Sequence, residues 1–325
     1  MPEADPLAVD RLLGRIFGGR SFRFERTSDG VSTQVYRIFR GEQIFYLRLP
    51  VDTPGSFAAE AAVHSELRRL GATVPEIVHY ELFDEELRRS VLVTTEIPGG
   101  PMISYGGHGV VKTGAPAREA LPKIYRAAGR DLALVNQIAV DGFGWIQNRQ
   151  TGWPLHAGHR DFGSWLADFD AATLRQLEFS HADVDRVEQI VADEVRHAPP
   201  PGHGRLAHGD FYVSQVFHRD GHYTGMIDFG SIQGSNGWHD LATFRLSDPE
   251  QDMPEDAAVP HLEAGYAEVA DVPPDFRARV LGTAVTIMAE RLVRQYLAEG
   301  EAARARASFR IFLHHLHQLM REQFS

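Results

Sequence analysis

The sequence contains no cysteine at all. This absence excludes disulfide bonds, thiolate metal sites and cysteine nucleophiles, and it fits a reducing compartment. Long apolar runs are also missing, because none approaches the roughly 20 residues that span a bilayer. Residues 1–17 carry acids and a proline where a signal peptide needs a basic start and an apolar run. We therefore expect a cytoplasmic protein without a membrane partner.

Positive charge is scarce as well. The 33 Lys and Arg residues stand against 44 Asp and Glu, a formal net charge of −11 at pH 7. A nucleic-acid-binding protein normally presents a basic face to the phosphates, so the charge disfavours that class. An acidic surface attracts cationic ligands, although its more ordinary effect is solubility. The 325 residues suffice for one large or two medium domains, and the oligomeric state stays open.

The first hundred residues are typical of a β-rich domain. Short segments of aromatic and β-branched residues predict strands, with Gly41 at a hairpin turn between two of them. These segments are residues 22–26, 34–39, 43–49, 76–82 and 91–96. Between the third and the fourth segment, Val63, Leu67 and Leu70 recur at helical spacing. Gly71 then offers a C-cap for this helix.

A run of two prolines and two glycines at residues 98–101 interrupts this pattern and predicts a domain boundary. Residues 98–325 then form a mainly helical domain, whose apolar stripes predict three long helices. The helices are residues 121–135, 276–297 and 302–320. The one strand-like island in this half spans residues 216–229, where Asp220-Gly221 between alternating apolar runs predicts a two-residue hairpin turn.

The predicted hairpin brings polar residues together. With Asp220 and Gly221 as the turn, Gln215 faces Met226. Because strand side chains alternate between two faces, Asp228 is then a diagonal neighbour of Gln215 on the same face. Such neighbours stand roughly 7–8 Å apart at Cα, close enough for both side chains to meet one metal ion.

A third oxygen-bearing side chain lies close by. Asp210 comes five residues before Gln215, in the loop that enters the hairpin. Carboxylate, amide and water oxygens are the ligands that Mg²⁺ prefers. Each of these residues alone is more ordinarily a turn former or a satisfied polar group. The combination with Asp228 at this spacing predicts a functional site.

The segments around these residues resemble a known family. HGDFYVSQ (208–215), IDFG (227–230) and WHDLA (238–242) are similar to the motifs of the aminoglycoside phosphotransferase and choline kinase-like superfamily. The likeness extends to residues 30–37, 46–48, 60, 93–97 and 140–144. It implies an α+β, two-lobed, protein-kinase-like fold. Residues 1–97 are then a small β-rich, nucleotide-binding N-lobe, and residues 98–325 are a larger, mainly helical C-lobe for catalysis and substrate binding.

The resemblance implies roles for the central residues. Asp210 accepts or orients the proton of the acceptor hydroxyl, and Asp228 holds Mg²⁺ against the phosphates of ATP or GTP. Gln215 is the second metal ligand, at a position where the family usually has Asn and sometimes His. Its longer side chain leaves the geometry of the metal site open. His208 and Asp240 are expected to brace the loop rather than to take part in the chemistry.

The resemblance also implies a nucleotide site in the N-lobe. Arg48 stands where protein kinases place a lysine, and it is expected to pair with Glu60 or with phosphate. The plainer alternatives are a surface charge at a strand end for Arg48 and a favourable acid in the first turn of a helix for Glu60.

Four further residues are expected to contact the nucleotide, from the same resemblance. Ser32 and Thr33 are expected near the phosphates, although their loop contains only Gly30. The backbone groups of Glu96 and Ile97 are expected to meet adenine at the hinge between the lobes.

The favoured function is phosphorylation of a hydroxyl on a small molecule. A protein kinase is disfavoured because Tyr212 replaces the usual catalytic-loop lysine and only about ten residues separate Asp228 from Asp240, too few for an activation loop. One alternative is a nucleotide-binding regulatory pseudoenzyme, suggested by Gln215 and Arg48. A metal-dependent hydrolase is more distant, because few histidines lie near the aspartates.

The acceptor itself stays open among antibiotics, amino alcohols, sugars and nucleosides. Family prevalence and net acidity favour a cationic, aminoglycoside-like antibiotic. The acidic segment 248–256 is ordinarily a solvated loop. A further hypothesis is that Glu250, Asp252 and Asp256 line a pocket for an amine-bearing substrate.

Overall fold

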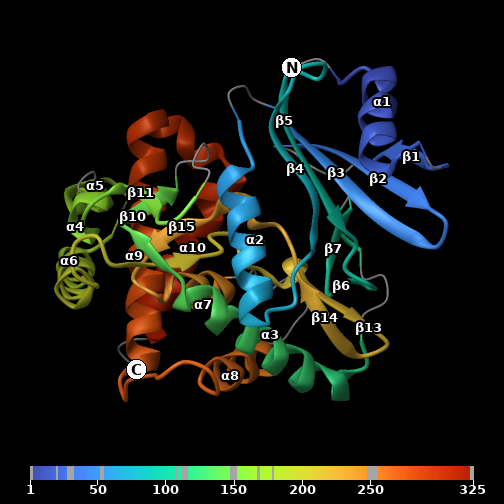
Figure 1. Ribbon diagram of the computed structural model, residues 1–325. Helices are drawn as coiled ribbons and strands as arrows, with labels where there is room; N and C mark the ends of the chain where they lie inside the picture. The colour runs from blue at the N-terminus through green and yellow to red at the C-terminus, as the bar shows by residue number, and fades with distance from the viewer. Residues whose placement is uncertain are drawn as a thin grey trace.

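A computed structural model describes residues 3–19, 21–27, 33–51, 55–106, 109–111, 116–146, 152–166, 169–177, 179–246 and 255–322. The fold is mixed α/β, with a β-sheet N-terminal region followed by a mainly helical C-terminal region (Figure 1). This is the fold class that the sequence predicts. No helix within the described ranges combines the length and the apolar character that crossing a bilayer requires.

The N-terminal region is built on an antiparallel sheet of five strands in the order β1-β2-β3-β5-β4. Its strands are β1 (Arg23–Arg26), β2 (Thr33–Arg40), β3 (Gln43–Pro50), β4 (Ile77–Asp84) and β5 (Arg89–Thr95). All five strands predicted from the sequence are present, with ends shifted by one or two residues. Buried side chains alternate with half-buried ones along β2 and most of β3, so the sheet has two distinct faces.

One face of the sheet packs against helix α1 (Pro6–Phe17), which the β-rich prediction missed. Asp5 caps this helix by accepting a hydrogen bond from the Leu7 backbone N–H, and Pro6 stands at its first position. Its apolar stripe joins the side chains of this face in one core, which includes Leu12, Leu13, Ile38, Leu47 and Val93. The cap, the proline and the stripe were all visible in the sequence.

The opposite face of the sheet is covered in part by helix α2 (Ala58–Leu70), which lies beside the sheet in Figure 1. Leu92 of β5 packs against Ala61 of this helix. Arg48 pairs with Leu92 in the strand register and therefore projects from the same face. The helix ends at Gly71, as predicted.

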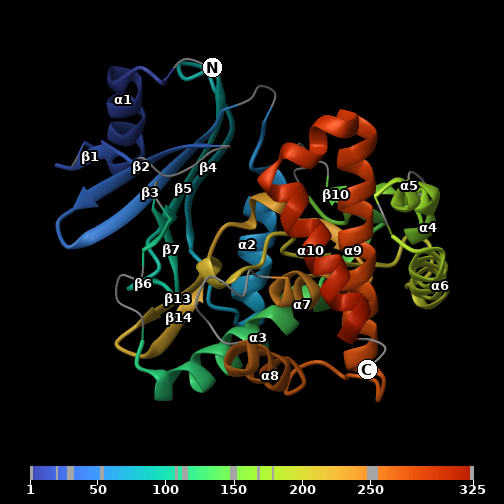
Figure 2. The same ribbon diagram turned by 180° about the vertical axis from the view of Figure 1, so that it is seen from behind.

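The C-terminal region is formed mainly by helices (Figure 2). They are α3 (Leu121–Gln137), α4 (Phe162–Trp165), α5 (Ala171–Gln176), α6 (His181–His197), α7 (His239–Arg245), α8 (Glu255–Tyr266), α9 (Phe276–Glu299) and α10 (Ala307–Glu322). The three long predicted helices correspond to α3, α9 and α10. The last of them begins later than expected, because residues Gly300–Ala305 form a 3₁₀ segment.

Short strands also occur in the C-terminal region, so the expectation of a single strand-like island was wrong. Five of them close into a small barrel in the order β10-β11-β9-β12-β15. They are β9 (Ala139–Asp141), β10 (Phe143–Ile146), β11 (Leu155–His159), β12 (Gly204–Ala207) and β15 (Gln233–Ser235). Strands of three to five residues leave too few alternations to be recognised in a sequence.

The predicted hairpin is present as β13 (Val216–Arg219) and β14 (His222–Met226), with the turn at the expected place. Its register is not the predicted one. His218 opposes Tyr223 near the turn, but a bulge shifts the pairing so that Val216, not Gln215, opposes Met226.

The bulge lies between Tyr223 and Gly225, where Thr224 is the extra residue, and Gly225 has the unusual backbone conformation. This residue has φ +145°, and a Cβ there would lie 2.7 Å from the carbonyl oxygen of Thr73. The strand therefore kinks where only glycine fits. As a result Gln215 and Asp228 lie beyond the ends of the two strands rather than on their faces.

The segment between the sheet and the helical region contacts the same hairpin. Strand β6 (Gly100–Pro101) pairs with β13, and the Thr224 hydroxyl donates to the carbonyl oxygen of Pro98 at 2.7 Å. Two further short strands, β7 (Ser104–Gly106) and β8 (Gly109–Val111), follow it. The chain thus leaves the first sheet after β5 and passes directly beside the residues predicted to form the site.

Candidate active site

The loop that carries Asp210 follows β12 and is held by a buried carboxylate. Asp240, at the start of α7, accepts hydrogen bonds from the backbone N–H groups of His208 (2.8 Å) and Gly209 (2.9 Å). It also accepts one from the side-chain amide of Asn136 at 2.9 Å. Because these bonds tie the loop to two helices, Asp210 is presented from a rigid support. The predicted bracing role of Asp240 is confirmed.

His208 joins this loop to the segment that carries Asp228. A ring N–H donates to the carbonyl oxygen of Ile227, with Nε2 and O 2.8 Å apart. The buried ring also packs against Phe229 and Phe211, at centroid distances of 4.6 and 5.6 Å. The side chain therefore acts as a brace, as predicted.

Asp210 lies partly exposed at the end of this braced loop. Burial is the main cause that raises the pKa of its carboxyl group, and the negative charge of Asp228 acts in the same direction. The positive charge of Arg291 opposes the rise. A carboxylate with a raised pKa is a better proton acceptor, which is what a general base requires.

Asp228 is held in a left-handed backbone conformation, with φ 69° and ψ 59°. Such a conformation costs a non-glycine residue on the order of 1–3 kcal/mol and persists only where the surroundings enforce it. Here the flanking residues enforce it, because Ile227 is bonded to His208 and Phe229 is fully buried. The Asp228 carboxylate remains 49% exposed and lies 3.6 Å from Nη2 of Arg48.

Arg48 meets Glu60, as predicted. Its Nη1 donates to Oε1 of Glu60, whose side chain is only 5% exposed. Burial alone would raise the pKa of Glu60, but the charge of Arg48 and a contact with His64 outweigh it and lower the pKa to about 2. The His64 ring in turn packs against the ring of Phe229, with the two ring centroids 5.0 Å apart. Helix α2, the sheet and the Asp228 segment are thus linked side chain by side chain.

Gln215 ends the short 3₁₀ segment Val213–Gln215. Its backbone carbonyl accepts a hydrogen bond from the Ile227 N–H at 3.2 Å, which places it across the hairpin from the residue before Asp228. The two predicted metal ligands are therefore brought to the same end of the hairpin, by a turn and a left-handed residue instead of two strands.

The residues predicted to contact the nucleotide have different outcomes in the structure. Thr33 begins β2, in register with Pro50, whereas Ser32 lies outside the described residues. The Glu96 N–H donates to the carbonyl oxygen of Ile44 at 3.1 Å, so it is already used and cannot meet adenine. The contact of the Glu96 and Ile97 backbone with adenine stays a prediction. The carbonyl oxygen of Glu96 and the backbone of Ile97 are the groups that remain for that role.

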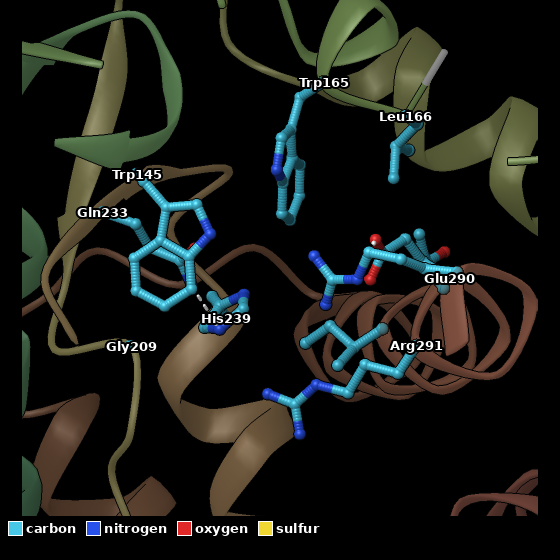
Figure 3. Close-up of a pocket in the computed structure, with 11 residues that line it drawn as sticks. Trp145, Trp165, Leu166, Gly209, Gln233, His239, Glu290 and Arg291 are labelled. Carbon is cyan, nitrogen blue, oxygen red and sulfur yellow. Dashed lines mark hydrogen bonds and ion pairs between the residues drawn. The ribbon is translucent and has the colours of Figure 1, made fainter. Parts of the chain in front are cut away.

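A pocket beside the Asp210 loop was not recognised in the sequence. Its cavity volume is about 50 Å³, it is partly open to solvent, and Figure 3 shows its walls. The walls are Trp145, Trp165, Leu166, Gly209, Gln233, His239, Thr286, Ile287, Glu290, Arg291 and Arg294. These residues come from six separate segments of the chain, so no spacing in the sequence could have grouped them.

The sequence itself matches a family. A model of the phosphotransferase enzyme family, APH, matches residues 23–272. The chain belongs to this family. The matched range contains both aspartates, the Arg48–Glu60 pair and the bracing residue Asp240. No curated protein matches the sequence.

Solved structures show the fold of this phosphotransferase family member to be protein-kinase-like. Aminoglycoside phosphotransferase APH(4)-Ia superposes with a TM-score of 0.64 at 14% identity, over 99% of this chain and 100% of its own. Macrolide 2'-phosphotransferase MphH from Brachybacterium faecium gives 0.60 at 20% identity, over 94% and 97%. A thermostable mutant of APH(4)-Ia, in ternary complex with AMP-PNP and hygromycin B, gives 0.63 at 15% identity, over 98% and 99%.

Proposed function

We propose that this phosphotransferase moves the γ-phosphate of ATP, as its Mg²⁺ complex, to a hydroxyl group of a small molecule, with Asp210 as the base. The observation that carries the proposal is the position of the Asp228 carboxylate beside both Asp210 and a cation. Its negative charge raises the pKa of Asp210, and it lies 3.6 Å from Nη2 of Arg48. The complex of the APH(4)-Ia mutant with AMP-PNP supports a nucleotide as donor.

The residues present suit Mg²⁺ and a triphosphate. Asp228 offers an exposed carboxylate held in a strained conformation, and Gln215 brings an amide to the same end of the hairpin. A bound Mg²⁺ supplies positive charge against the phosphates. Arg48, oriented by buried Glu60, adds a guanidinium that matches phosphate geometry. Thr33 would lie near the phosphates, and the Glu96 carbonyl and the Ile97 backbone near adenine.

Asp210 would orient the acceptor hydroxyl and take its proton. The new bond joins the acceptor oxygen to the γ-phosphorus, the bond from that phosphorus to the bridging oxygen breaks, and ADP leaves. Little covalent chemistry is asked of the protein, because positioning and charge neutralisation supply most of the acceleration. The rigid loop held by Asp240 serves this positioning.

A small molecule is a better acceptor candidate than a protein. After Asp228 the chain forms a 3₁₀ turn (Phe229–Ser231) and strand β15, and it then enters α7 at His239. These elements fill the interval in which a protein kinase has its activation loop.

We include in the proposal a nucleotide-binding lobe of residues 1–97, a catalytic lobe of residues 98–325 and a cytoplasmic location.

The division of roles between the two aspartates is testable. Asp210→Asn should lower phosphoryl transfer, or Mg²⁺-dependent ATP hydrolysis, at least about 100-fold while nucleotide affinity stays within a factor of about two, because it removes the base and no metal ligand. Asp228→Asn should instead weaken binding of Mg·ATP. Isothermal titration with AMP-PNP and Mg²⁺, beside a coupled assay for ADP release, measures both.

Asp220→Asn is the matched control. This aspartate lies at the exposed hairpin turn with φ 51°, where asparagine is well tolerated, and its variant should behave as the wild type. Equal loss of nucleotide affinity in Asp210→Asn and Asp228→Asn would show the division to be wrong. Nucleotide binding without any transfer in the wild type would favour the regulatory pseudoenzyme. That alternative is suggested by Gln215 at the metal-ligand position, where the family usually has Asn.

A further inference from the structure

A buried carboxylate away from the proposed site joins the two regions of the chain. Asp131 of α3 is only 8% exposed. Its Oδ2 accepts a hydrogen bond from the backbone N–H of Thr73 at 2.8 Å and another from the hydroxyl of Tyr223 at 2.9 Å. Tyr223 belongs to β14 in the C-terminal region, whereas Thr73 follows α2 in the N-terminal region. One carboxylate oxygen therefore links the two regions directly.

Thr73 is bonded to the C-terminal region through both of its backbone polar groups. Its N–H donates to Asp131, and its carbonyl oxygen accepts from the N–H of Met226 at 3.0 Å. Gly225 permits this approach, because a Cβ there would lie 2.7 Å from the same oxygen. Met226 comes two residues before Asp228, so Thr73 is fixed relative to the proposed metal ligand.

The segment between α2 and β4 is bound in turn to α2. The Arg68 guanidinium donates to the carbonyl oxygen of Val74 at 2.9 Å, and Nδ1 of the His64 ring lies 3.0 Å from the carbonyl oxygen of Pro75. The same histidine contacts Glu60, with Nε2 and Oε1 3.7 Å apart. Because the segment and the helix are joined in this way, an anchor on the segment also fixes the helix that carries Glu60.

The packing of α2 agrees with this connection. Its side chains Ala59, Val63 and Leu67 lie in the same core as the buried side chains of α3, whereas the sheet and α1 share a separate core. Both views show α2 between the sheet and the helices of the C-terminal region (Figure 1 and Figure 2). The ion pair of Arg48 on β3 with Glu60 on α2 therefore joins elements that pack in different cores.

We propose that Asp131 is a positioning residue for phosphoryl transfer. Through Thr73 it fixes α2 to the catalytic region, so that Glu60 holds Arg48 in one place relative to Asp228. Asp131 touches neither substrate and acts only through the backbone it anchors, an inference that rests on the proposed function. Residues that orient a metal site from behind its ligands contribute about 10- to 100-fold to metal affinity or activity.

Two substitutions of Asp131 separate its hydrogen bonds from its charge. Asp131→Asn keeps an oxygen that can accept from both Thr73 and Tyr223, so the affinity for AMP-PNP with Mg²⁺ should stay within about twofold of the wild type. Asp131→Leu has a similar size but leaves both donors unpaired, so the affinity should fall about tenfold. Isothermal titration of the full-length variants measures this, at a temperature where circular dichroism shows each of them folded.

Tyr223→Phe is the matched control. It removes the second hydrogen bond to the same oxygen, but that bond joins β14 to α3 within the C-terminal region, and the bond to Thr73 remains. The variant should lose stability and keep the wild-type affinity. The proposal would be overturned by an unchanged affinity in Asp131→Leu, or by an equal loss in either Tyr223→Phe or Asp131→Asn.

Hydrogen exchange tests the same link in the wild-type protein, and it decides the matter if Asp131→Leu does not fold. With rising urea, the amides of α2 should become exchangeable together with those of α3 rather than with those of the sheet strands. Exchange of α2 together with the sheet would overturn the proposal. Because this measurement needs no nucleotide, failure of the wild type to bind AMP-PNP would count against the proposed function alone, and the exchange pattern would still judge the link.

Discussion

At the residue scale, the chemistry of the site depends on a few charges held in unequal surroundings. Asp228 is half exposed, Asp210 is more enclosed, and Glu60 is buried against Arg48. The residue types could be read from the sequence because each lies in a short local motif. Their surroundings could not, since burial depends on side chains from distant parts of the chain, such as Arg291 and His64.

Glu60→Gln tests the buried pair. The substitution leaves Arg48, which is 16% exposed, without its neutralising partner. Removing one member of a buried pair costs about 3 kcal/mol of unfolding free energy. It should also raise the KM for Mg·ATP about tenfold, because Arg48 would turn toward Asp228, 3.6 Å away. Urea denaturation and steady-state kinetics measure the two effects.

Glu66→Gln on the same helix provides the comparison. Glu66 pairs with Arg69 at the surface, and an exposed pair of this kind is worth well under about 1 kcal/mol. Its variant should keep the wild-type KM. If the two variants were equally stable and equally active, Glu60 would be no more than a favourable acid in the first turn of α2.

At the element scale, the hairpin shows where prediction from sequence ends. The Asp-Gly turn is a local signal, and it correctly located the chain reversal between β13 and β14. The bulge at Gly225 has a non-local cause, the close approach of the Thr73 carbonyl, so the register beyond it could not be foreseen. Helix α1 is the opposite case, since its signals were local and were overlooked.

Gly225→Ala should destabilise the protein by roughly 2 kcal/mol or more. Alanine would be strained at φ +145°, and its Cβ would press on the Thr73 oxygen at 2.7 Å. Because the bulge sets the end of the hairpin, the variant should also lose Mg·ATP affinity by displacing Gln215 and Asp228. Denaturation midpoints and titration with AMP-PNP measure both.

Gly14→Ala is the contrasting substitution. Gly14 lies inside α1, and no atom stands within 4 Å of the position that a Cβ would take, so alanine should stabilise the helix by about 0.5–1 kcal/mol. A Gly225→Ala protein that is as stable as the wild type would mean that the bulge is not enforced by Thr73.

At the scale of the whole molecule, the two-region architecture was predictable because the motifs of the family span most of the chain. The pocket beside the Asp210 loop was not, because its walls come together only when β10, β15, α4, α7 and α9 are packed. The segment 248–256, in which the sequence suggested an amine-binding role, gives no test. Glu250 and Asp252 lie outside the described residues, and the side chain of Asp256 is not described.

Packing of these elements also buries a carboxyl group that no sequence motif marks. Glu194 of α6 accepts hydrogen bonds from the Thr283 hydroxyl of α9 at 2.6 Å and from the Asn236 amide at 2.8 Å. Burial is the main cause that raises the pKa of Glu194 to about 7, against the opposing effect of these hydrogen bonds. The folded protein therefore keeps a proton that the unfolded chain has already released.

This buried proton predicts how stability depends on pH. A carboxyl group with a raised pKa in the folded state contributes its full stabilisation below the unfolded pKa of about 4.5, and the contribution is lost as pH rises to about 7. The loss amounts to about 3 kcal/mol across that window, at about 1.4 kcal/mol for each pKa unit.

Glu194→Gln keeps an amide oxygen for Thr283 and Asn236 but cannot ionise. Its unfolding free energy in urea should therefore fall less between pH 5 and pH 7 than that of the wild type. Glu188→Gln, exposed on the same helix, should keep the wild-type slope. Parallel slopes for the wild type and Glu194→Gln would mean that Glu194 is already ionised in the folded protein and that its burial between α6 and α9 does not hold the proton.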